Sequence, residues 1–486
     1  MALNSHLPTE KQQKLKQLMV IFSILLITLL FVFTFLIAKP TRELSSFELD
    51  RQGQKVGSGP TEFRVYNHQV YVAVPSNGHY LIPEADLKTI RMLSDDIATR
   101  QIAVDQKHVY CGNMILKNLN PQTVRSIGDG YITDGQVSYY CSQITERNTE
   151  LNVVKEVWQI LLHHTGIGSK PQNYWYPHYQ LEVSKFPYQL TVQGTVSNGE
   201  NTYFRGKLVE QANGHTMRYL PSYSGSSERL RESSHYTADG THVYYKNQRV
   251  PVQDHPQLMV FDFGGGVESE FLQDRKTQNF YYQTSPFSQK YSPYYLLNKD
   301  DEHAHDPLFL SQQGIYFYHR KEQKLQRVGD NPFSQKLTQL APDVFHNGQD
   351  TYYLGLYDKY ISSGRGTKLC YRSTVLYRLK NAPVNRWQKI AEVKYGDAQW
   401  RAATIWKNGT QYYYFDEFGQ GQGFNQAVYL IKDAYALRFI LNPSRSSDDI
   451  RQYVGRGILL SPQVERLLKA KYDEKFCLSL FWSESE

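Results

Sequence analysis

Short runs of aromatic and β-branched residues, separated by polar turns, recur along most of the chain. Examples are HVYYKN from 242 to 247 and TQYYYF from 410 to 415. Such residues favour the pleated surface of a β-sheet, and the polar residues between the runs are typical of tight turns. The pattern predicts an all-β fold of repeated antiparallel meander units with a β-propeller-like architecture.

A fixed spacing between Asx-Gly dipeptides and tyrosine marks the predicted units. In five of the eight Asx-Gly dipeptides a tyrosine follows the Asx residue by five positions, whereas random placement would give about 0.6 such cases. Asx-Gly supplies the positive φ angles of a hairpin turn, and the fixed offset places each tyrosine on one face of its strand. We expect units to start near 67, 105, 134, 198, 239, 274, 311, 347 and 408, with a degenerate unit or an insertion in each of the two gaps of about 60 residues.

Two segments depart from the strand pattern. Apolar residues at a helical period predict an inserted helix near 151–166. Residues 443–486 are expected to form a small α+β C-terminal segment, with helices over 448–454 and 463–472 and a closing strand over 476–482.

The longest apolar run extends from Leu18 to Ala38 without a charged residue. As a helix it would measure about 30 Å, the thickness of a bilayer core. It exceeds the apolar stretch of a cleaved signal peptide, the alternative interpretation, and lacks a small-x-small cleavage site. Three preceding lysines favour a cytoplasmic N-terminus, so we expect a single-pass inner-membrane protein with most of the chain in the periplasm.

These patterns divide the chain into six parts. In order they are a cytoplasmic tail (1–17), a transmembrane helix (18–38), a linker (43–60), a β-repeat region with the inserted helix (61–261), a further β-repeat, propeller-like region (262–442), and the C-terminal segment (443–486).

Charge placement argues against a nucleic-acid partner. The formal charge of +7 is concentrated in the first 42 residues, which hold five basic residues and one acidic residue. The remaining chain is close to neutral and lacks the dense basic stripe that phosphate binding requires.

The four cysteines all follow the predicted anchor, where an oxidising compartment permits disulfides. Cys111 and Cys141 occupy near-equivalent positions in consecutive units, and neighbouring strands lie within disulfide range. We therefore pair Cys111 with Cys141, which leaves Cys370 with Cys477 by elimination. Four reduced thiols in a packed interior are the alternative.

Candidate chemistry is sparse. The chain contains no GxSxG, HExxH, P-loop or GxGxxG motif, so no catalytic residue and no cofactor is expected. Asp301, His303 and His305 are weak candidates for a metal site, although a charged loop explains them equally well. Repeated tyrosines favour an interlocking core. Irregularly placed aromatic residues are therefore the weak candidates for exposed binding contacts: Tyr174, Trp175, Tyr176, Tyr294 and Tyr295.

Two stretches, Ile102 to Ile127 and His235 to Phe261, share an Asp, a five-residue step to tyrosine, a polar turn, an apolar strand and a Pro-Gln pair. In these features the sequence resembles the bacterial DKNYYY repeat family, over about 61–145 and 195–261. The resemblance implies an exported or membrane-tethered β-repeat protein, with no established reaction and no catalytic residues. Some members look like neighbours of toxin systems, which suggests immunity proteins.

The expected function is therefore binding. We expect a non-enzymatic recognition protein that meets a protein or glycan of the cell envelope, and within that class we favour an immunity protein that neutralises a toxin. The alternative is an envelope enzyme that acts on glycans through unrecognised carboxylates, which would face each other across a cleft.

Overall fold

The structure is a computed structural model, and it describes residues 46–164, 170–224, 230–263, 269–297, 307–333, 336–363, 366–380, 382, 387–396, 400–419, 424–442 and 446–473. The predicted tail (1–17), anchor (18–38) and closing strand (476–482) lie outside these ranges. Among the described helices, none is both long and apolar enough to cross a membrane. The chain divides into two compact units, Met1–His215 and Thr216–Glu486.

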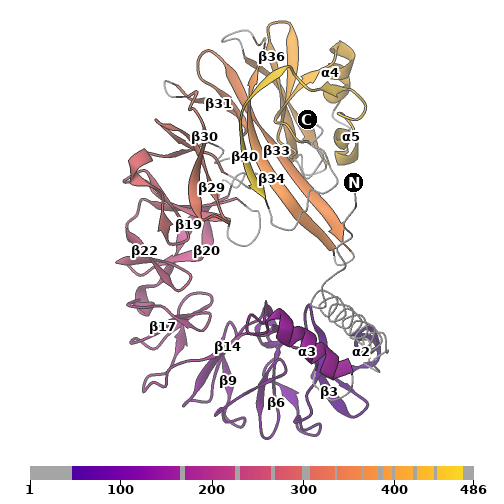
Figure 1. The fold of residues 1–486 in the computed structure, drawn as a ribbon, viewed down its shortest axis with the longest axis vertical. Coiled ribbons are helices and arrows are strands. Elements are labelled where there is room, and N and C mark those ends of the chain that lie inside the picture. The colour runs from indigo at the N-terminus through magenta and orange to yellow at the C-terminus, as the bar shows by residue number, and fades with distance from the viewer. Residues whose placement is uncertain are drawn as a thin grey trace, which may run out of the picture. The chain divides into compact units, whose positions relative to one another are not determined.

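Unit 1 contains four sheets of four antiparallel strands, which follow one another in chain order (Figure 1). The helix α2 (Ser46–Gln52) precedes them. The third sheet carries an insertion that holds the helix α3 (Val153–His164) and the two-stranded ladder of β12 (Glu146–Arg147) and β13 (Tyr174–Trp175). The strands of the four sheets are β1 (Gln54–Lys55), β2 (Phe63–Tyr66), β3 (Gln69–Val74) and β4 (Gly78–Leu81); β5 (Arg91–Met92), β6 (Ile102–Val104), β7 (Val109–Cys111) and β8 (Met114–Leu116); β9 (Arg125–Gly128), β10 (Tyr131–Thr133), β11 (Ser138–Cys141) and β14 (His178–Gln180); β15 (Gln189–Leu190), β16 (Thr195–Ser197), β17 (Thr202–Phe204) and β18 (Lys207–Leu208).

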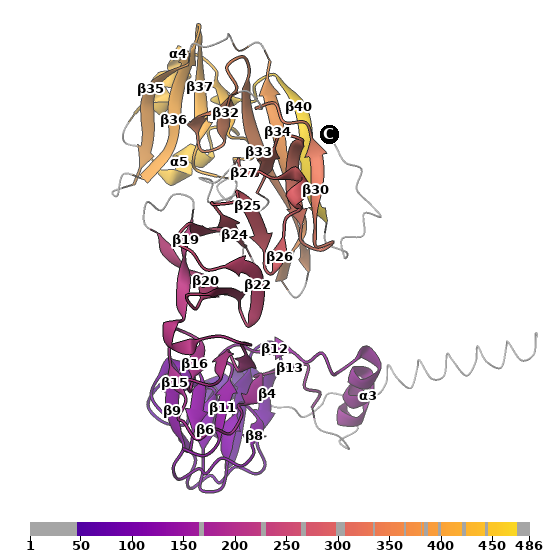
Figure 2. The same ribbon diagram turned by 90° about the vertical axis from the view of Figure 1, so that its left-hand side faces the viewer.

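Unit 2 continues the same pattern with larger sheets (Figure 2). Its first sheet has eight strands, because β19 pairs with β23 in parallel and so joins two four-stranded meanders. Two short helices, α4 (Ala434–Ile440) and α5 (Ser447–Arg451), follow the last meander. The strands are β19 (Arg218–Tyr223), β20 (Arg231–Ala238), β21 (His242–Tyr245) and β22 (Gln248–Gln253); β23 (Leu258–Asp262), β24 (Glu270–Asp274), β25 (Asn279–Tyr282) and β26 (Ser285–Pro286); β27 (Tyr295–Leu296), β28 (Phe309–Ser311), β29 (Gly314–His319) and β30 (Lys324–Gly329); β31 (Thr338–Ala341), β32 (Val344–His346), β33 (Thr351–Ser363), β34 (Gly366–Leu379) and β40 (Val464–Asp473); β35 (Gln388–Tyr395), β36 (Trp400–Asn408), β37 (Gln411–Asp416), β38 (Val428–Ile431) and β39 (Leu459–Leu460).

The predicted β-rich repeat is confirmed. Each of the nine expected unit starts lies at the hairpin between the second and third strands of a four-stranded meander. The two wide gaps contain insertions, as predicted. One holds α3, and the other holds the long β33–β34 hairpin, which pairs from Tyr352 and Arg378 out to Ser363 and Gly366.

The five-residue spacing has a specific physical cause in the Asx side chain. Asp105 Oδ1 accepts hydrogen bonds from the amides of Lys107 and His108, at 2.7 and 2.6 Å. Its Oδ2 accepts one from the hydroxyl of Tyr110 at 2.7 Å. One carboxylate therefore closes the turn and anchors the tyrosine of the following strand.

The same arrangement recurs in later units. Asp239 Oδ1 accepts from the amides two and three residues on, at 2.9 and 2.6 Å, and the hydroxyl of Tyr244 donates to Oδ2 at 3.1 Å. Asn347 closes its turn in the same way and donates from Nδ2 to the hydroxyl of Tyr352 at 3.1 Å. The Asn347 side chain therefore donates to the tyrosine hydroxyl, whereas Asp105 and Asp239 accept from it, and the arrangement of turn and tyrosine is otherwise the same.

Strand register follows from this turn. In five hairpins the residue before Asx pairs with the residue four positions after it, as in Val104 with Val109 and Ala238 with Val243. Because cross-strand partners share a face and successive residues alternate, Asx and the tyrosine five positions on must lie on the same face. The glycine after Asx has a positive φ in all five Asx-Gly-Tyr turns, as predicted: Gly135, Gly199, Gly240, Gly348 and Gly409.

The marker tyrosines are buried between neighbouring meanders, which confirms the predicted core role. In unit 1, one hydrophobic core joins the first three sheets and includes Phe63, Ile102 and Tyr110. A second joins the third and fourth sheets through Tyr131 and Tyr203. Each meander thus buries its faces against its neighbours in the sequence, as in other repeat proteins.

Two predicted boundaries and one predicted helix are wrong. The interval 43–60 contains α2 and β1 where a linker was expected, and Leu49 of α2 is buried. The boundary at 261/262 falls inside β23, within the eight-stranded sheet. The predicted helix over 463–472 is strand β40, because pairing with β34 buries Leu468 and Ala470 at a period of two and overrides helix propensity.

Replacement of Asp105 by alanine tests the Asx turn. Its loss leaves two turn amides and the Tyr110 hydroxyl without their acceptor, so we expect a local destabilisation of about 2–4 kcal/mol. Hydrogen exchange of the β6 and β7 amides in the full chain measures it. Asp95→Ala, at an exposed site in the connection between β5 and β6, is the control, and equal protection in both variants would contradict the assigned role.

The turn also predicts an acid dependence. Burial is the largest influence on the pKa of Asp105 and raises it, but hydrogen bonds from the Asp86 amide, the Tyr110 hydroxyl and the turn amides outweigh burial and leave it below 3.8. Burial raises the pKa of Asp134 as well, but hydrogen bonds from its turn amides and from the Asn120 amide outweigh burial and lower that pKa. A carboxylate whose pKa is lower in the folded than in the unfolded state stabilises the folded protein at neutral pH. This contribution to the free energy of unfolding is lost as the pH falls through the folded-state pKa.

We therefore expect the urea concentration at the midpoint of unfolding to decrease as the pH is lowered below about 4. This decrease should be less steep in the double variant Asp105→Asn/Asp134→Asn. An identical pH profile for variant and parent would show that these carboxylates are not the titrating groups.

Candidate functional site

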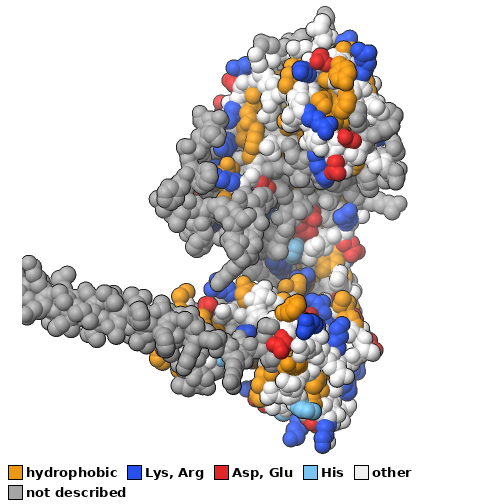
Figure 3. Space-filling view, turned by 90° about the vertical axis from the view of Figure 1, so that its right-hand side faces the viewer, with side chains coloured by type: hydrophobic (Ala, Val, Ile, Leu, Met, Phe, Trp, Pro, Cys, Tyr) orange, Lys and Arg blue, Asp and Glu red, His pale blue; other side chains and the backbone are white. Residues whose placement is uncertain are grey.

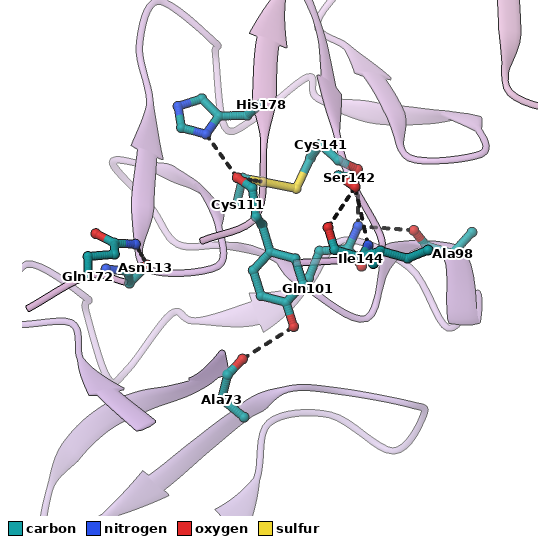
Figure 4. The surroundings of a disulfide bond; sticks show 11 residues. Ala73, Ala98, Gln101, Cys111, Asn113, Cys141, Ser142, Ile144, Gln172 and His178 are labelled. Atoms are coloured by element: carbon teal, nitrogen blue, oxygen red, sulfur yellow. Dashed lines mark hydrogen bonds between the residues drawn. A yellow bond between two sulfur atoms is a disulfide. The ribbon is translucent and has the colours of Figure 1, made fainter. Parts of the chain in front are cut away.

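The predicted disulfide between Cys111 and Cys141 is present, with the two Cα atoms 5.9 Å apart (Figure 4). It joins the end of β7 to the end of β11 and so links the second and third sheets. The reduced-thiol alternative is wrong for this pair. Cys370 is also disulfide-bonded. Cys477 lies outside the described residues, so its pairing stays a prediction.

Tyr176 is a buried structural residue beneath this disulfide, and the expectation that it is exposed is wrong. Its hydroxyl donates to the carbonyl of Ala73 in the first sheet at 3.3 Å, and its own carbonyl lies 3.9 Å from Cys111 Sγ. The close approach of its ring to Gly112 leaves no room there for a side chain. Tyr176 thus ties the end of the inserted segment to the first and second sheets.

The other aromatic candidates divide between buried and accessible positions. Tyr294 is buried, packs edge-on against Phe287 and donates to the carbonyl of Ser288 at 2.7 Å, so its expected exposure is also wrong. Tyr295 is exposed. Tyr174 and Trp175 are half-buried in β13. A binding role for these three stays a prediction.

The weak metal candidates Asp301, His303 and His305 lie outside the described ranges. Within those ranges, no group of three or more His, Cys, Asp or Glu side chains is arranged to hold a metal ion.

Several buried carboxylates have structural partners instead of facing a cleft. Glu270 accepts from the Ser233 hydroxyl at 2.8 Å and from the Ser234 amide at 2.7 Å. Asp416 accepts from the Gly419 amide at 2.9 Å. Burial raises the pKa of Glu417, and an ion pair with Arg401 at 2.6 Å opposes that effect. These contacts account for the burial of the three carboxylates, because each one has a partner within the fold.

The best candidate contact site is the loop between β14 and β15, residues 181–188. At its start the Leu181 amide donates to the carbonyl of Ser138 at 2.9 Å. At its end the buried Tyr188 hydroxyl donates to the carbonyl of Glu182 at 3.0 Å. Burial raises the pKa of Tyr188, so the hydroxyl keeps its proton and remains a donor at neutral pH.

The repeat itself supports this loop. Tyr203, the marker tyrosine of the fourth unit, packs edge-on against Tyr188 with ring centroids 5.7 Å apart. Its hydroxyl accepts from the Glu182 amide at 3.4 Å, and Asn201 Nδ2 donates to Glu182 Oε2 at 3.0 Å. The loop is therefore held at both ends by buried side chains.

Two large apolar side chains nevertheless point away from this support. Val183 is 71% exposed and Phe186 is 54% exposed. Beside them is a small cavity of about 90 Å³, which Phe186 helps to line. The other lining residues are Arg125, Thr133, Gly135, Gln136, Ser138, Glu182, Ser184, Lys185, Pro187 and Tyr188.

The cavity size limits the ligand. Sites for drug-sized molecules span about 300–1,000 Å³, and this cavity has room for about three water molecules or one protein side chain. Its rim combines Arg125, Lys185 and Glu182 with an apolar flank, a mixture typical of protein interfaces.

Sequence patterns did not identify this loop. The signal lies in VSKFPY from 183 to 188, where two large apolar residues interrupt a polar connection between short strands. On the face that Figure 3 draws, positive and negative side chains of the described residues are interspersed, with apolar side chains among them.

The structure defines a β-repeat protein in which the loop 181–188 is fixed at both ends and exposes two apolar side chains. Residues 63–248 match the model of the DKNYY family, which confirms the resemblance to that family over β2 to the start of β22. No curated protein and no solved structure matches the chain.

The disulfide is expected to stabilise the sheets that support the loop. Because it closes a 30-residue segment, its removal in Cys111→Ala/Cys141→Ala should cost about 3–4 kcal/mol. Faster hydrogen exchange of β7 and β11 measures the loss, with strands β35–β37 as the internal reference. Unchanged protection of β7 and β11 would contradict this contribution.

Proposed function

We propose that the protein is a single-pass inner-membrane protein whose periplasmic β-repeats form a non-enzymatic recognition module. Residues 18–38 are the proposed anchor and residues 1–17 the cytoplasmic tail. The apolar length of 18–38 and the position of the lysines before it support this orientation. The module meets a protein partner of the cell envelope through the loop 181–188.

The observation that supports binding most directly is the exposure of Val183 and Phe186 on a loop whose ends are fixed. An exposed aromatic ring on a preorganised loop can bury a large area with little loss of conformational entropy. Protein hot spots have this character, with an apolar anchor and a polar rim.

The small cavity beside Phe186 indicates the form of the partner. A volume of about 90 Å³ suits one inserted side chain. Arg125 and Lys185 outnumber Glu182 at the rim, so the partner would present an apolar side chain flanked by acidic residues. A glycan would place several hydroxyl groups over a wider aromatic surface.

Within this class we propose an immunity-type role, in which the tethered module neutralises a toxin that acts at the envelope. Support comes from the anchor sequence, from the match to the DKNYY family over 63–248, and from the resemblance of some members of that family to neighbours of toxin systems.

We also propose that successive meanders within each compact unit pack as the blades of a propeller do. Four antiparallel strands per meander, and cores that join meanders consecutive in the sequence, support this arrangement.

Removal of the exposed ring tests the proposal. The detergent-solubilised full chain should recover a partner by affinity capture, and Phe186→Ala should reduce the recovered amount by about tenfold or more, the usual effect of losing an aromatic anchor. Phe47→Ala removes an even more exposed ring from α2 of the same unit and should leave recovery unchanged.

Two outcomes would contradict the proposed function. One is the absence of any partner from the wild-type sample. The other is equal recovery by the Phe186→Ala and Phe47→Ala proteins, which would place the contact elsewhere.

A further inference from the structure

The helix α3 presents its apolar face away from the protein. At 100° per residue, Val154 and Trp158 lie about 160° around the helix from Glu156. Glu156 faces the β12–β13 ladder, where its carboxylate accepts from Asn173 Nδ2 at 3.0 Å and pairs with Arg147 of β12 at 3.8 Å. The polar side therefore attaches the helix, and the apolar side is turned outward.

This orientation is the reverse of that in an ordinary surface helix, which packs its apolar stripe against the core. Val154 is 79% exposed and Trp158 is 62% exposed, and Val153 and Val157 are also exposed. No described residue of α3 is buried. Figure 2 shows α3 standing to one side of the sheets of unit 1. An apolar face of this kind on a short, displaced helix marks an interaction surface.

The position of α3 in the chain indicates what covers that face. The first described residue, Ser46, comes eight residues after the proposed anchor ends at Ala38. Eight extended residues reach at most about 28 Å, so this side of unit 1 must lie close to the bilayer.

The segment that contains α3 returns to the sheets beside the same point. Lys170, six residues after α3, and Ser46 both lie next to Gly78, with Ser46 Oγ and Lys170 Nζ 3.0 and 3.2 Å from the position that a Cβ atom would take there. The helix segment and the chain from the anchor thus meet at one edge of the first sheet.

We propose that α3 lies in the interface of the bilayer that holds the anchor, with Val154, Val157 and Trp158 among the lipid chains. This inference rests on the proposed anchor. Twelve residues form a helix of about 18 Å, too short to span a bilayer but suited to lie in its plane. Tryptophan is enriched at this depth, because its ring is apolar and its N–H can reach the polar layer.

The charge of α3 adds little to this contact. Lys155 and Glu156 balance each other, so apolar burial is the main source of affinity, and anionic lipids should be unnecessary. Docking of α3 would also limit the rotation of unit 1 about its tether, and so fix the side from which the loop 181–188 meets a partner.

Quenching of Trp158 by brominated lipid tests the proposal in the full chain. The protein is reconstituted at high dilution into phosphatidylcholine liposomes, with or without bromine on the lipid chains, and the emission of Trp158→Phe is subtracted from that of the wild type. Bromine near the headgroup end of the chains should lower the difference emission about twofold or more, and bromine near the chain ends should lower it less.

Matched charge substitutions on the two faces complete the test. Val154→Asp places a charge on the apolar face and should abolish quenching of Trp158. Gln159→Asp places the same charge on the polar side and should leave quenching unchanged. Equal quenching in both variants would overturn the proposed orientation.

Flotation of the liposomes separates failure of this inference from failure of the anchor. A protein that floats with the liposomes but whose Trp158 is unquenched would keep the anchor and overturn the interfacial helix, leaving its apolar face to a second copy or to another protein. A protein that does not float would overturn both proposals.

Discussion

The structure depends on one recurring interaction, the closure of a tight turn by an Asx side chain, which at Asp105, Asp239 and Asn347 also bonds the tyrosine on the next strand. In Asp105 and Asp239 a single carboxylate accepts from two turn amides and from the tyrosine hydroxyl. The turn sets the strand register, and the register places the tyrosine between neighbouring meanders. Local hydrogen bonding and long-range packing are therefore specified by the same few residues.

A repeat built this way tolerates change away from its central hairpin. The largest additions, the α3 segment and the extension of β33 and β34, both lie outside the Asx turns. Functional variation is expected in such places, since a loop can change while the hairpins on either side keep their register. The β14–β15 loop fits this view, because Tyr203 belongs to the repeat and contacts Tyr188 of the loop.

Features that depend on short-range spacing could be predicted from the sequence. Six of the nine hairpins follow from an Asx residue with a tyrosine five positions on. The disulfide follows because Cys111 and Cys141 come one and two residues after the marker tyrosines of consecutive units. The α3 helix follows from its apolar period. In each case the determining residues lie within one or two units of the chain.

Features that depend on distant partners could not be predicted. The segment that forms β40 has good helix formers, and only β34, almost a hundred residues earlier, makes it a strand. The sequence around Tyr176 is typical of an exposed aromatic residue. Its burial depends on the first sheet, where the carbonyl of Ala73 accepts from its hydroxyl. The outward orientation of the apolar face of α3 could not be predicted either, because an apolar period does not show which side of a helix is buried.

The central claim is that these repeats serve to present a contact loop to a protein partner near the membrane. The most direct measurement is photocrosslinking in living cells, with a photoreactive phenylalanine analogue at position 186 and, separately, at position 47 as the reference. The account predicts one discrete adduct with an envelope protein at position 186 and none at position 47. Absence of an adduct at 186, or the same adducts at both positions, would contradict it.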